Sequence, residues 1–203
     1  MGRIFIGILL SFSLNVYCQD KQIEESIYRD FASKGIANDQ TEIILDEVAN
    51  NFIAVQTCIS DIVEKSLSIN QKNELKRKTL GYFQSHQSII EVTNLNLGET
   101  MQRYISDYLD RLINMPYFKV TLIWDNQFSV SELFNEGSGN YQIGAGCWQY
   151  FIVRNQEGII VYSDRTYKRA FFSIKRLSNG WYIKINNIKA EETKKYTFKS
   201  TYR

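Results

Sequence analysis

The spacing of apolar residues changes at Pro116, and this change constrains the fold more than any other feature of the sequence. Downstream, the segment Phe118 to Trp124 alternates apolar and polar residues, which is the period of a half-buried strand. Helices followed by strands indicate an α+β fold, because an α/β fold would alternate the two. Upstream, the following apolar residues recur every three or four positions, as on one face of a helix: Ile44, Val48, Phe52, Val55, Ile59 and Ile62.

The sequence predicts mainly helices in the first half of the chain. Asp39 and Glu42 form a pattern like a capping box, and Pro116 closes the last helix because proline cannot continue one. The elements expected in order are a helix over 22–33, a long helix over 39–70, a helix over 71–84, a strand over 88–95 and an amphipathic helix over 101–115.

Strands joined by hairpins fill the second half. Asn179–Gly180 is a strong hairpin signal, and the turn that ends at Gly158 is a second one. The expected strands are 118–124, 141–154, 159–174 and 181–188, and a charged tail follows from Glu191.

Four glycines lie close together in NEGSGNYQIGAGCWQYF, residues 135–151. A dinucleotide-binding loop would place such glycines between a strand and a helix. Here Gly146 leads into the strand-like segment CWQYFIV. We therefore predict a hairpin tip over Gly137–Asn140, and a bulge, a bend or the close approach of another group at Gly144 and Gly146.

Residues 1–18 have the composition of a secretory signal peptide. Arg3 precedes the apolar run Ile4 to Leu14, which is too short to span a membrane. Cleavage after Cys18 would start the mature protein at Gln19 and place it in the periplasm or outside the cell. Lipid anchoring at Cys18 is the less favoured alternative, because Tyr17 is large for the position before an acylated cysteine. We expect no membrane-spanning segment, since no second long apolar run occurs.

Two cysteines, Cys58 and Cys147, remain after this cleavage. They could form one disulfide in an oxidising compartment, or remain buried thiols, which we slightly favour. We expect no metal and no cofactor, because His86 is the single histidine and no cofactor motif stands out. Acidic residues predominate over 20–74 and basic residues over 161–203, which gives either two solvated faces or surfaces for different partners.

The element order between residues 71 and 190 resembles that of the NTF2-like superfamily, the cystatin-like α+β cone. The resemblance runs from IIEVTNL through TMQRYISDYLDRLINMPYFKVTLIW to WYIKINNI and extends to exported bacterial proteins without an established activity. It implies N-terminal helices and a curved antiparallel sheet that wraps a helix, with a pocket between them. The long helix would then be an added layer or an interface. The expected domains are a signal peptide (1–18), a helical extension (19–70), the NTF2-like domain (71–190) and a charged tail (191–203).

If this resemblance holds, several aromatic side chains converge on the interior of the cone. They either fill the core, which is the commoner case, or surround a small-molecule pocket. The pocket candidates are Tyr104, Tyr108, Trp124, Trp148, Tyr150, Tyr162, Asp164 and Trp181.

No catalytic residue stands out from the sequence. The resemblance allows isomerase or dehydratase chemistry with a pocket acid, for which Asp107, Asp110, Asp164 and Tyr162 are available. We expect Asp107 and Asp110 to face solvent or to pair with Arg103 and Arg111. His86 lies in the polar connector QSHQS and is expected to be a solvated loop residue.

The basic and aromatic segment 165–176 superficially suits nucleic acid. Its alternation instead places Ala170, Phe172 and Ile174 on one face of a strand, with Arg169 and Lys175 on the other. Export argues against a nucleic-acid partner. An anionic glycan, a lipid head group or an acidic protein suits such a face better.

Three functional hypotheses follow, each with its own structural signature. The leading one is an exported, non-enzymatic domain that binds a small molecule or a protein, and it predicts an open aromatic pocket without a perturbed acid. An enzyme that uses the same pocket predicts a buried carboxylate in a pocket open to solvent. An envelope assembly component that self-associates predicts an exposed apolar stripe on the helix that bears Val48 and Ile62.

Overall fold

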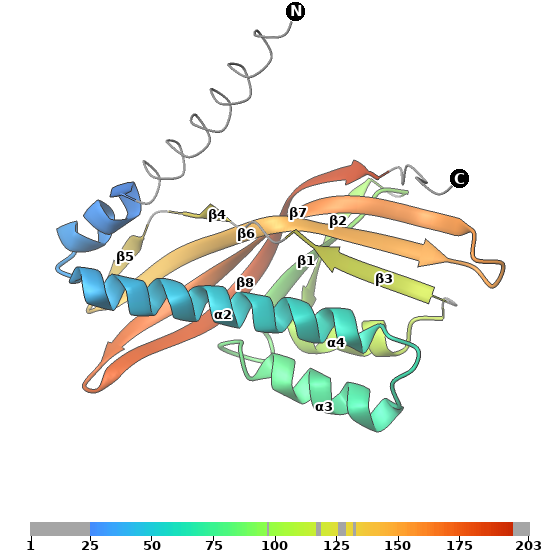
Figure 1. Ribbon diagram of the computed structural model, residues 1–203, viewed down its shortest axis with the longest axis horizontal. Helices are drawn as coiled ribbons and strands as arrows, with labels where there is room; N and C mark the ends of the chain where they lie inside the picture. Colours follow the sequence, from blue (N-terminus) through green and yellow to red (C-terminus); the bar gives the residue numbers. More distant parts are fainter. Residues whose placement is uncertain (1–24, 97, 117–118, 126–128, 132, 197–203) are drawn as a thin grey trace, which may run out of the picture. The chain divides into compact units, whose positions relative to one another are not determined.

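The computed structural model describes residues 25–96, 98–116, 119–125, 129–131 and 133–196 (Figure 1). The predicted signal peptide lies outside these residues. The chain divides into two compact units, 1–43 and 44–203. In the first unit, residues 25–33 are helical, Gly35 has a positive φ of 74°, and the helix α2 (Asn38–Ile62) begins.

The described part of the second unit contains a strongly curved sheet of eight strands (Figure 1). Its main path runs β2-β1-β8-β7-β6-β3, and β4 and β5 pair with β6 beside β3. All pairs are antiparallel except β1–β8. The strands are β1 (Ile89–Asn94), β2 (Glu99–Tyr104), β3 (Lys119–Trp124), β4 (Ser129–Val130), β5 (Phe134–Gly137), β6 (Asn140–Arg154), β7 (Ile160–Leu177) and β8 (Gly180–Lys195).

From residue 44 onward, α2 lies against the concave face of the sheet. Phe52 makes edge-to-face contacts with Trp124 of β3 and Phe172 of β7, each with 6.4 Å between ring centroids. The Gln56 amide donates to the Cys147 sulfur at 3.1 Å. The long helix is therefore the one that the sheet wraps, rather than an added layer. The apolar residues that recur along one side of α2, from Ile44 to Ile62, are all buried.

Two shorter helices follow. The helix α3 (Ile69–Leu80) begins with a capping box between Ser68 and Gln71. The helix α4 (Ile105–Ile113) is tied to it by an ion pair between Lys76 and Asp110 at 2.6 Å. Among the described helices, none has the length and apolarity needed to cross a membrane.

The predicted helix over 101–115 is wrong in its first turn. Residues 99–104 form the strand β2, which pairs antiparallel with β1, and Gly98 (φ 65°) lies between the two strands. Pairing with β1 decides this segment, because its own sequence is compatible with a helix. At the other end of the chain, residues 191–195 continue β8 and pair with β7, although the sequence analysis assigned them to a charged tail.

The predicted α+β class and the curved sheet around a helix are confirmed. Curvature arises in the long strands, where β7 and β8 shift register at Tyr167/Lys168 and Phe171/Phe172. Alternate residues of β7 point inward, and Ala170, Phe172 and Ile174, which were predicted to share one face of a strand, are buried. The core consequently lies between this face and α2.

The glycine-rich stretch forms a hairpin tip and then the first part of β6, where side chains from neighbouring segments lie close to the backbone. Gly137 and Gly139 have positive φ angles of 87° and 75° in the turn from β5 to β6. A Cβ atom on Gly146 would lie 2.7 Å from the Tyr167 hydroxyl oxygen, and one on Gly144 would lie 2.9 Å from the Ser131 hydroxyl oxygen. Close approach on the convex face is therefore the reason for these two glycines.

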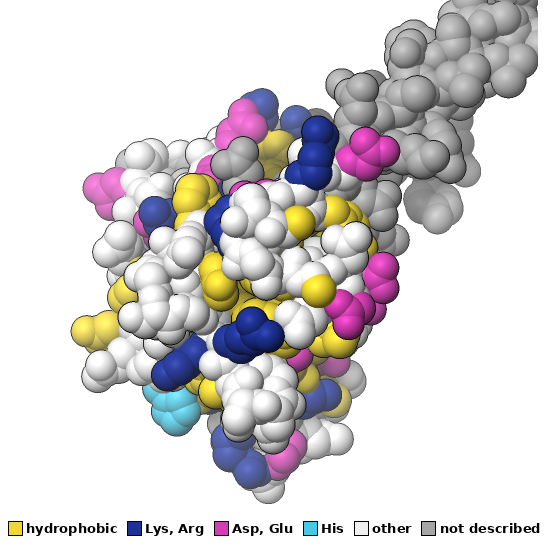
Figure 2. Space-filling view, turned by 90° about the vertical axis from the view of Figure 1, so that its left-hand side faces the viewer, with side chains coloured by type: hydrophobic (Ala, Val, Ile, Leu, Met, Phe, Trp, Pro, Cys, Tyr) yellow, Lys and Arg dark blue, Asp and Glu magenta, His cyan; other side chains and the backbone are white. Residues whose placement is uncertain are grey.

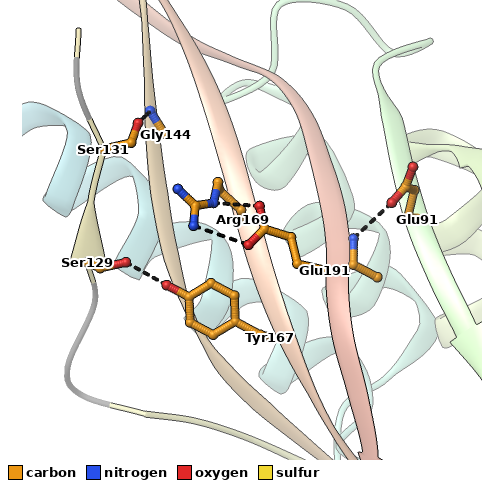
Figure 3. A network of polar contacts seen from close by, with 8 residues as sticks. Glu91, Ser129, Ser131, Gly144, Tyr167, Arg169 and Glu191 are labelled. Carbon is orange, nitrogen blue, oxygen red and sulfur yellow. Dashed lines mark hydrogen bonds and ion pairs between the residues drawn. The ribbon is translucent and has the colours of Figure 1, made fainter.

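Polar contacts hold this convex surface together (Figure 3). The Ser129 and Tyr167 hydroxyls lie 2.5 Å apart, and Arg169 pairs with Glu191 at 2.7 Å. The Gly144 amide donates to the Ser131 hydroxyl at 2.8 Å. The two serine contacts hold the segment around β4 against the outside of β6 and β7, and the ion pair joins β7 to β8.

Candidate functional site

A pocket of about 790 Å³ opens on the concave side of the sheet, away from the half that α2 fills. Its walls come from the β1–β2 hairpin, α4, and the parts of β6 and β7 that lie beyond α2. The apolar part of the lining includes Val92, Met101, Leu112, Phe151 and Val153. The rest of the lining is polar or charged, and a cavity of this size with both kinds of wall can hold a small molecule.

The pocket exists because β1 and β8 stay together for only two residue pairs. Ile89 and Ile90 pair in parallel with Asn187 and Ile188, and the strands then separate. Glu91 bridges the opening: its carboxylate accepts from the Ala190 amide at 3.0 Å (Figure 3), and its carbonyl oxygen accepts from the Lys168 ammonium. The Ala190 amide and the Glu91 carbonyl, which do not pair with each other between β1 and β8, thus each have a side-chain partner.

Four alternate residues of β7 carry polar groups along the pocket: Tyr162, Asp164, Thr166 and Lys168. The Asp164 side chain is central among them, and the residue is only 5% exposed. The Tyr162 hydroxyl donates to an Asp164 carboxylate oxygen at 2.5 Å and accepts from the Leu95 amide at 3.3 Å. This bond ties the acid to the β1–β2 wall.

Burial raises the pKa of Asp164 above its usual value. The Tyr162 hydrogen bond, the nearby Lys168 charge and a Thr166 hydrogen bond oppose this increase without cancelling it. The carboxyl therefore holds its proton to a higher pH than an exposed aspartate does. A buried carboxyl with a raised pKa at a cavity wall is a candidate general acid or base.

Lys168 is the second titratable group in the pocket wall. It is 4% exposed, and burial lowers its pKa to about 8, although Asp164 and Glu91 act in the opposite direction. Within the described part of the chain, no ion pair joins Lys168 to Asp164. The amine and the carboxyl thus face the same cavity as separate groups.

Tyr108 faces them from α4. Burial, followed by the negative charge of Asp164, raises the pKa of Tyr108 well above its ordinary value, while a hydrogen bond with Gln149 opposes this. The phenol consequently stays protonated and can donate a hydrogen bond to an oxygen atom in the pocket.

Two arginines add positive charge to the lining. Arg103 of β2 donates to the Met101 sulfur at 3.5 Å, and Arg111 lies one turn after Tyr108 on α4. Asp110 is exposed, as expected, and it pairs with Lys76 rather than with an arginine. Asp107 is exposed, as expected. The pocket therefore favours an anionic or electron-rich ligand.

Of the eight candidates named from sequence, the structure brings three together in the pocket: Tyr108, Tyr162 and Asp164. Trp124 packs on Phe52 in the core, and Trp181 packs on Tyr141 with 6.3 Å between ring centroids. The other three lie outside the cavity. Tyr104 is exposed, whereas Trp148 and Tyr150 contact Tyr167 and Tyr196 respectively on the convex face.

The buried polar residues of the pocket that sequence reasoning did not select are Gln149, Thr166 and Lys168. Each lies in phase with core positions of its own strand, as Lys168 does with Ala170 and Phe172. A polar residue at a position whose alternate neighbours are apolar was the available signal. The sequence analysis instead considered Lys168 only as a member of the basic and aromatic segment 165–176.

Other candidate chemistries receive little support from the geometry. Cys58 and Cys147 are separate buried thiols. His86 is exposed and is the cyan side chain in Figure 2, where hydrophobic side chains are interspersed with polar and charged ones. The described residues include no group of three or more potential metal ligands. A second hollow of about 770 Å³ is lined by Lys65, Lys119 and others, and it contains no buried titratable side chain.

No protein-family profile matches this chain. No curated protein sequence matches it.

Several solved structures are similar in chain course. A putative scytalone dehydratase from Novosphingobium aromaticivorans is 9% identical, with 79% of this chain and 93% of that chain covered and a TM-score of 0.45. A putative aromatic ring hydroxylase from the same species is 13% identical, with 73% and 90% covered and a TM-score of 0.43. An NTF-2-like protein of unknown function from Shewanella oneidensis is 9% identical, with 70% and 98% covered and a TM-score of 0.32.

Proposed function

We propose that the pocket is the active site of a small-molecule enzyme that works by proton transfer. One observation carries this proposal: Asp164 is a buried carboxylic acid in a pocket open to solvent. That feature is the signature expected for an enzyme and not for a simple binding domain. The signature of an assembly component is absent from α2 in unit 2, whose apolar residues Val48, Phe52 and Ile59 are buried.

The side chains suggest distinct roles in an isomerisation or a dehydration. Asp164 as a carboxylate would remove a proton from carbon and, once protonated, return it to another position or to a departing hydroxyl. The Tyr108 hydroxyl would donate to the oxygen on which negative charge develops. The apolar lining would exclude water, and Arg103 with Arg111 would favour a substrate that carries negative charge.

Proton exchange tests this function without knowledge of the natural substrate. The purified chain is incubated in D₂O with a panel of cyclic and aryl ketones, and loss of the α-proton signals is followed by NMR. We expect exchange for at least one ketone, reduced by about 10²-fold or more in Asp164→Asn, since general acid–base groups contribute about that much. Asp107→Asn is the matched control, because this aspartate is exposed on α4.

Two results would overturn the enzymatic proposal. One is exchange no faster than in buffer for every ketone, and the other is equal exchange by Asp164→Asn and the wild type. If ketones or their carboxylated analogues nevertheless perturb NMR signals of pocket residues, then the non-enzymatic binding function, our leading hypothesis from sequence alone, is the correct one.

We also propose that the protein is exported, with cleavage after Cys18. The support is the n-region and h-region pattern of residues 1–18. Expression of the full chain in a bacterial host followed by N-terminal sequencing tests it. A mature protein that begins at Gln19 is expected, whereas a cytoplasmic product that retains residues 1–18 contradicts export.

A further inference from the structure

Lys168 has surroundings unlike those of an ordinary surface lysine. Its ammonium donates to the Glu91 carbonyl oxygen, and the residue is 4% exposed at the wall of the cavity. The charged and titratable groups around the cavity are Tyr162 and Asp164 on β7, Glu91 on β1, Arg103 on β2, and Tyr108 and Arg111 on α4.

We propose that Lys168 is a nucleophilic amine that forms an imine with an aldehyde or ketone bound in the pocket. The proposal goes beyond proton transfer at Asp164 and shares with it only the assumption that the pocket binds a small molecule. It assigns a class of ligand, namely a carbonyl compound with an apolar body. The residues Val92, Met101 and Phe151 would contact that body.

The geometry supplies what an attacking amine requires. A neutral lysine that donates one N–H to Glu91 keeps its lone pair free for bond formation. Because Lys168 has a pKa of about 8, about one molecule in ten carries the neutral amine at pH 7, against fewer than one in a thousand for an ordinary lysine. Desolvation in an apolar pocket is a recognised way to activate a lysine.

Asp164 lies on the same face of β7, four residues before Lys168, at about 13 Å between Cα atoms in an extended strand. This separation leaves room for a carbonyl compound between the two side chains. It also agrees with the absence of an ion pair between them. The acid and the amine would then reach the same ligand from opposite ends.

The reaction balances without any further reactant. The nitrogen lone pair forms the C–N bond while the carbonyl π pair moves to oxygen, which takes up a proton and gives a carbinolamine. The second N–H proton follows to the same oxygen through Asp164 or water, the C–O bond breaks, and water leaves. The product is an imine to Lys168, with no change in oxidation state.

A purely structural role is the competing explanation, because Lys168 also satisfies the Glu91 carbonyl oxygen. Lys184 provides a matched comparison within the chain: it too donates to a backbone carbonyl, that of Gly81, but in an exposed setting. A lysine that only caps a carbonyl should behave like Lys184.

Reductive trapping distinguishes the two roles. The full chain is incubated with benzaldehyde and sodium cyanoborohydride at pH 7, and the benzylated lysines are located by peptide mass spectrometry. We expect labelling at Lys168 at least tenfold faster than at Lys184, with a rate that rises with pH and levels off above about 8. Lys168→Arg should lose this label while keeping its thermal transition, because arginine can still donate to Glu91. Lys184→Arg should keep it.

Labelling of Lys168 no faster than of Lys184 would overturn the proposal, as would the same fast adduct in Lys168→Arg. The site mapping in the wild type decides the question even if Lys168→Arg fails to fold. The outcome is separable from the proposed enzyme: ketone exchange that depends on Asp164 and persists in Lys168→Arg, without a Lys168 adduct, supports proton transfer and contradicts the imine.

Discussion

The two halves of the concave face along β7 have the same alternation but opposite chemistry. In one half, Ala170, Phe172 and Ile174 are at most 1% exposed, and Phe172 is in contact with Phe52 of α2. In the other, Asp164 and Lys168 occupy equivalent inward positions, with exposed fractions of 5% and 4%, yet they line a cavity. The difference comes from what lies opposite: a helix fills the first half, and a separating pair of strands opens the second. Burial alone therefore does not distinguish a core from a site, whereas the polarity of inward residues does.

The largest effect is expected in the apolar half. Phe172→Ala should lower the free energy of unfolding by about 3–5 kcal/mol, because it leaves a cavity against α2 that neighbours fill only partly. Asp164→Asn should cost much less, because an amide oxygen can still accept from the Tyr162 hydroxyl. Urea denaturation of both variants measures the contrast. Equal losses would mean that the two halves do not differ as described.

The second effect is a pH dependence specific to the polar half. The folded chain releases the Lys168 proton near pH 8, and the unfolded chain releases it near pH 10.5, so the unfolded chain binds more protons between these values. The free energy of unfolding should therefore rise with pH across this interval, by up to about 3 kcal/mol. Denaturation at a series of pH values should show this rise in the wild type relative to Lys168→Met. Parallel curves for the two proteins would exclude it.

The third prediction tests the opposite face of the same strands. Gly146→Ala should cost about 1–3 kcal/mol, because the new methyl group overlaps the Tyr167 ring. The cost should largely disappear in the Tyr167→Ala background, which a double-mutant cycle by urea denaturation measures. Labelling of Lys168 should stay unchanged, since Gly146 is outside the pocket lining. A slower labelling rate would show that the two faces are coupled.

The smallest effect is expected within the polar half itself. Tyr162→Phe removes the hydroxyl that donates to Asp164 and should raise the pKa of that carboxyl further, by about one unit or less. NMR titration of the side-chain carboxyl carbon measures the shift. Tyr108→Phe serves as the matched control, because the Tyr108 side chain has its hydrogen bond with Gln149. A larger pKa shift in Tyr108→Phe than in Tyr162→Phe would show that Tyr162 is not the main hydrogen-bond partner of Asp164.

Much of this architecture could be predicted because its signals are local. The alternation in 141–154 and 159–174 and the glycine turns located the meander, and the stripe from Ile44 to Ile62 located the long helix. The strand β2 was read as helix, since Met101, Tyr104 and Tyr108 have helical spacing and only the distant pairing with β1 overrides it. The position of α2 inside the curve of the sheet could not be predicted either, because it depends on contacts with the distant strands β3 and β7.

The site was only partly predictable for a related physical reason. Trp148 and Tyr150 were chosen because they are aromatic, but their strand phase places them on the convex face. Gln149, between them, points inward to the pocket. Which phase of β6 faces inward follows from its apolar set, Ile143, Ala145 and Cys147. The departure of β1 from β8, which creates the cavity, has no counterpart in any local pattern.

The brief attachment of β1 to β8 also bears on how such a protein can diversify. The β1–β2 hairpin is held by two residue pairs, the Glu91 bridge, the Leu95–Tyr162 hydrogen bond and α4, whereas β6, β7 and β8 pair along almost their whole length. Substitutions in the hairpin change one wall of the cavity without altering the registers on which the fold depends. The ligand preference of the pocket can therefore change through substitutions in the hairpin while the pairing of β6, β7 and β8 stays the same.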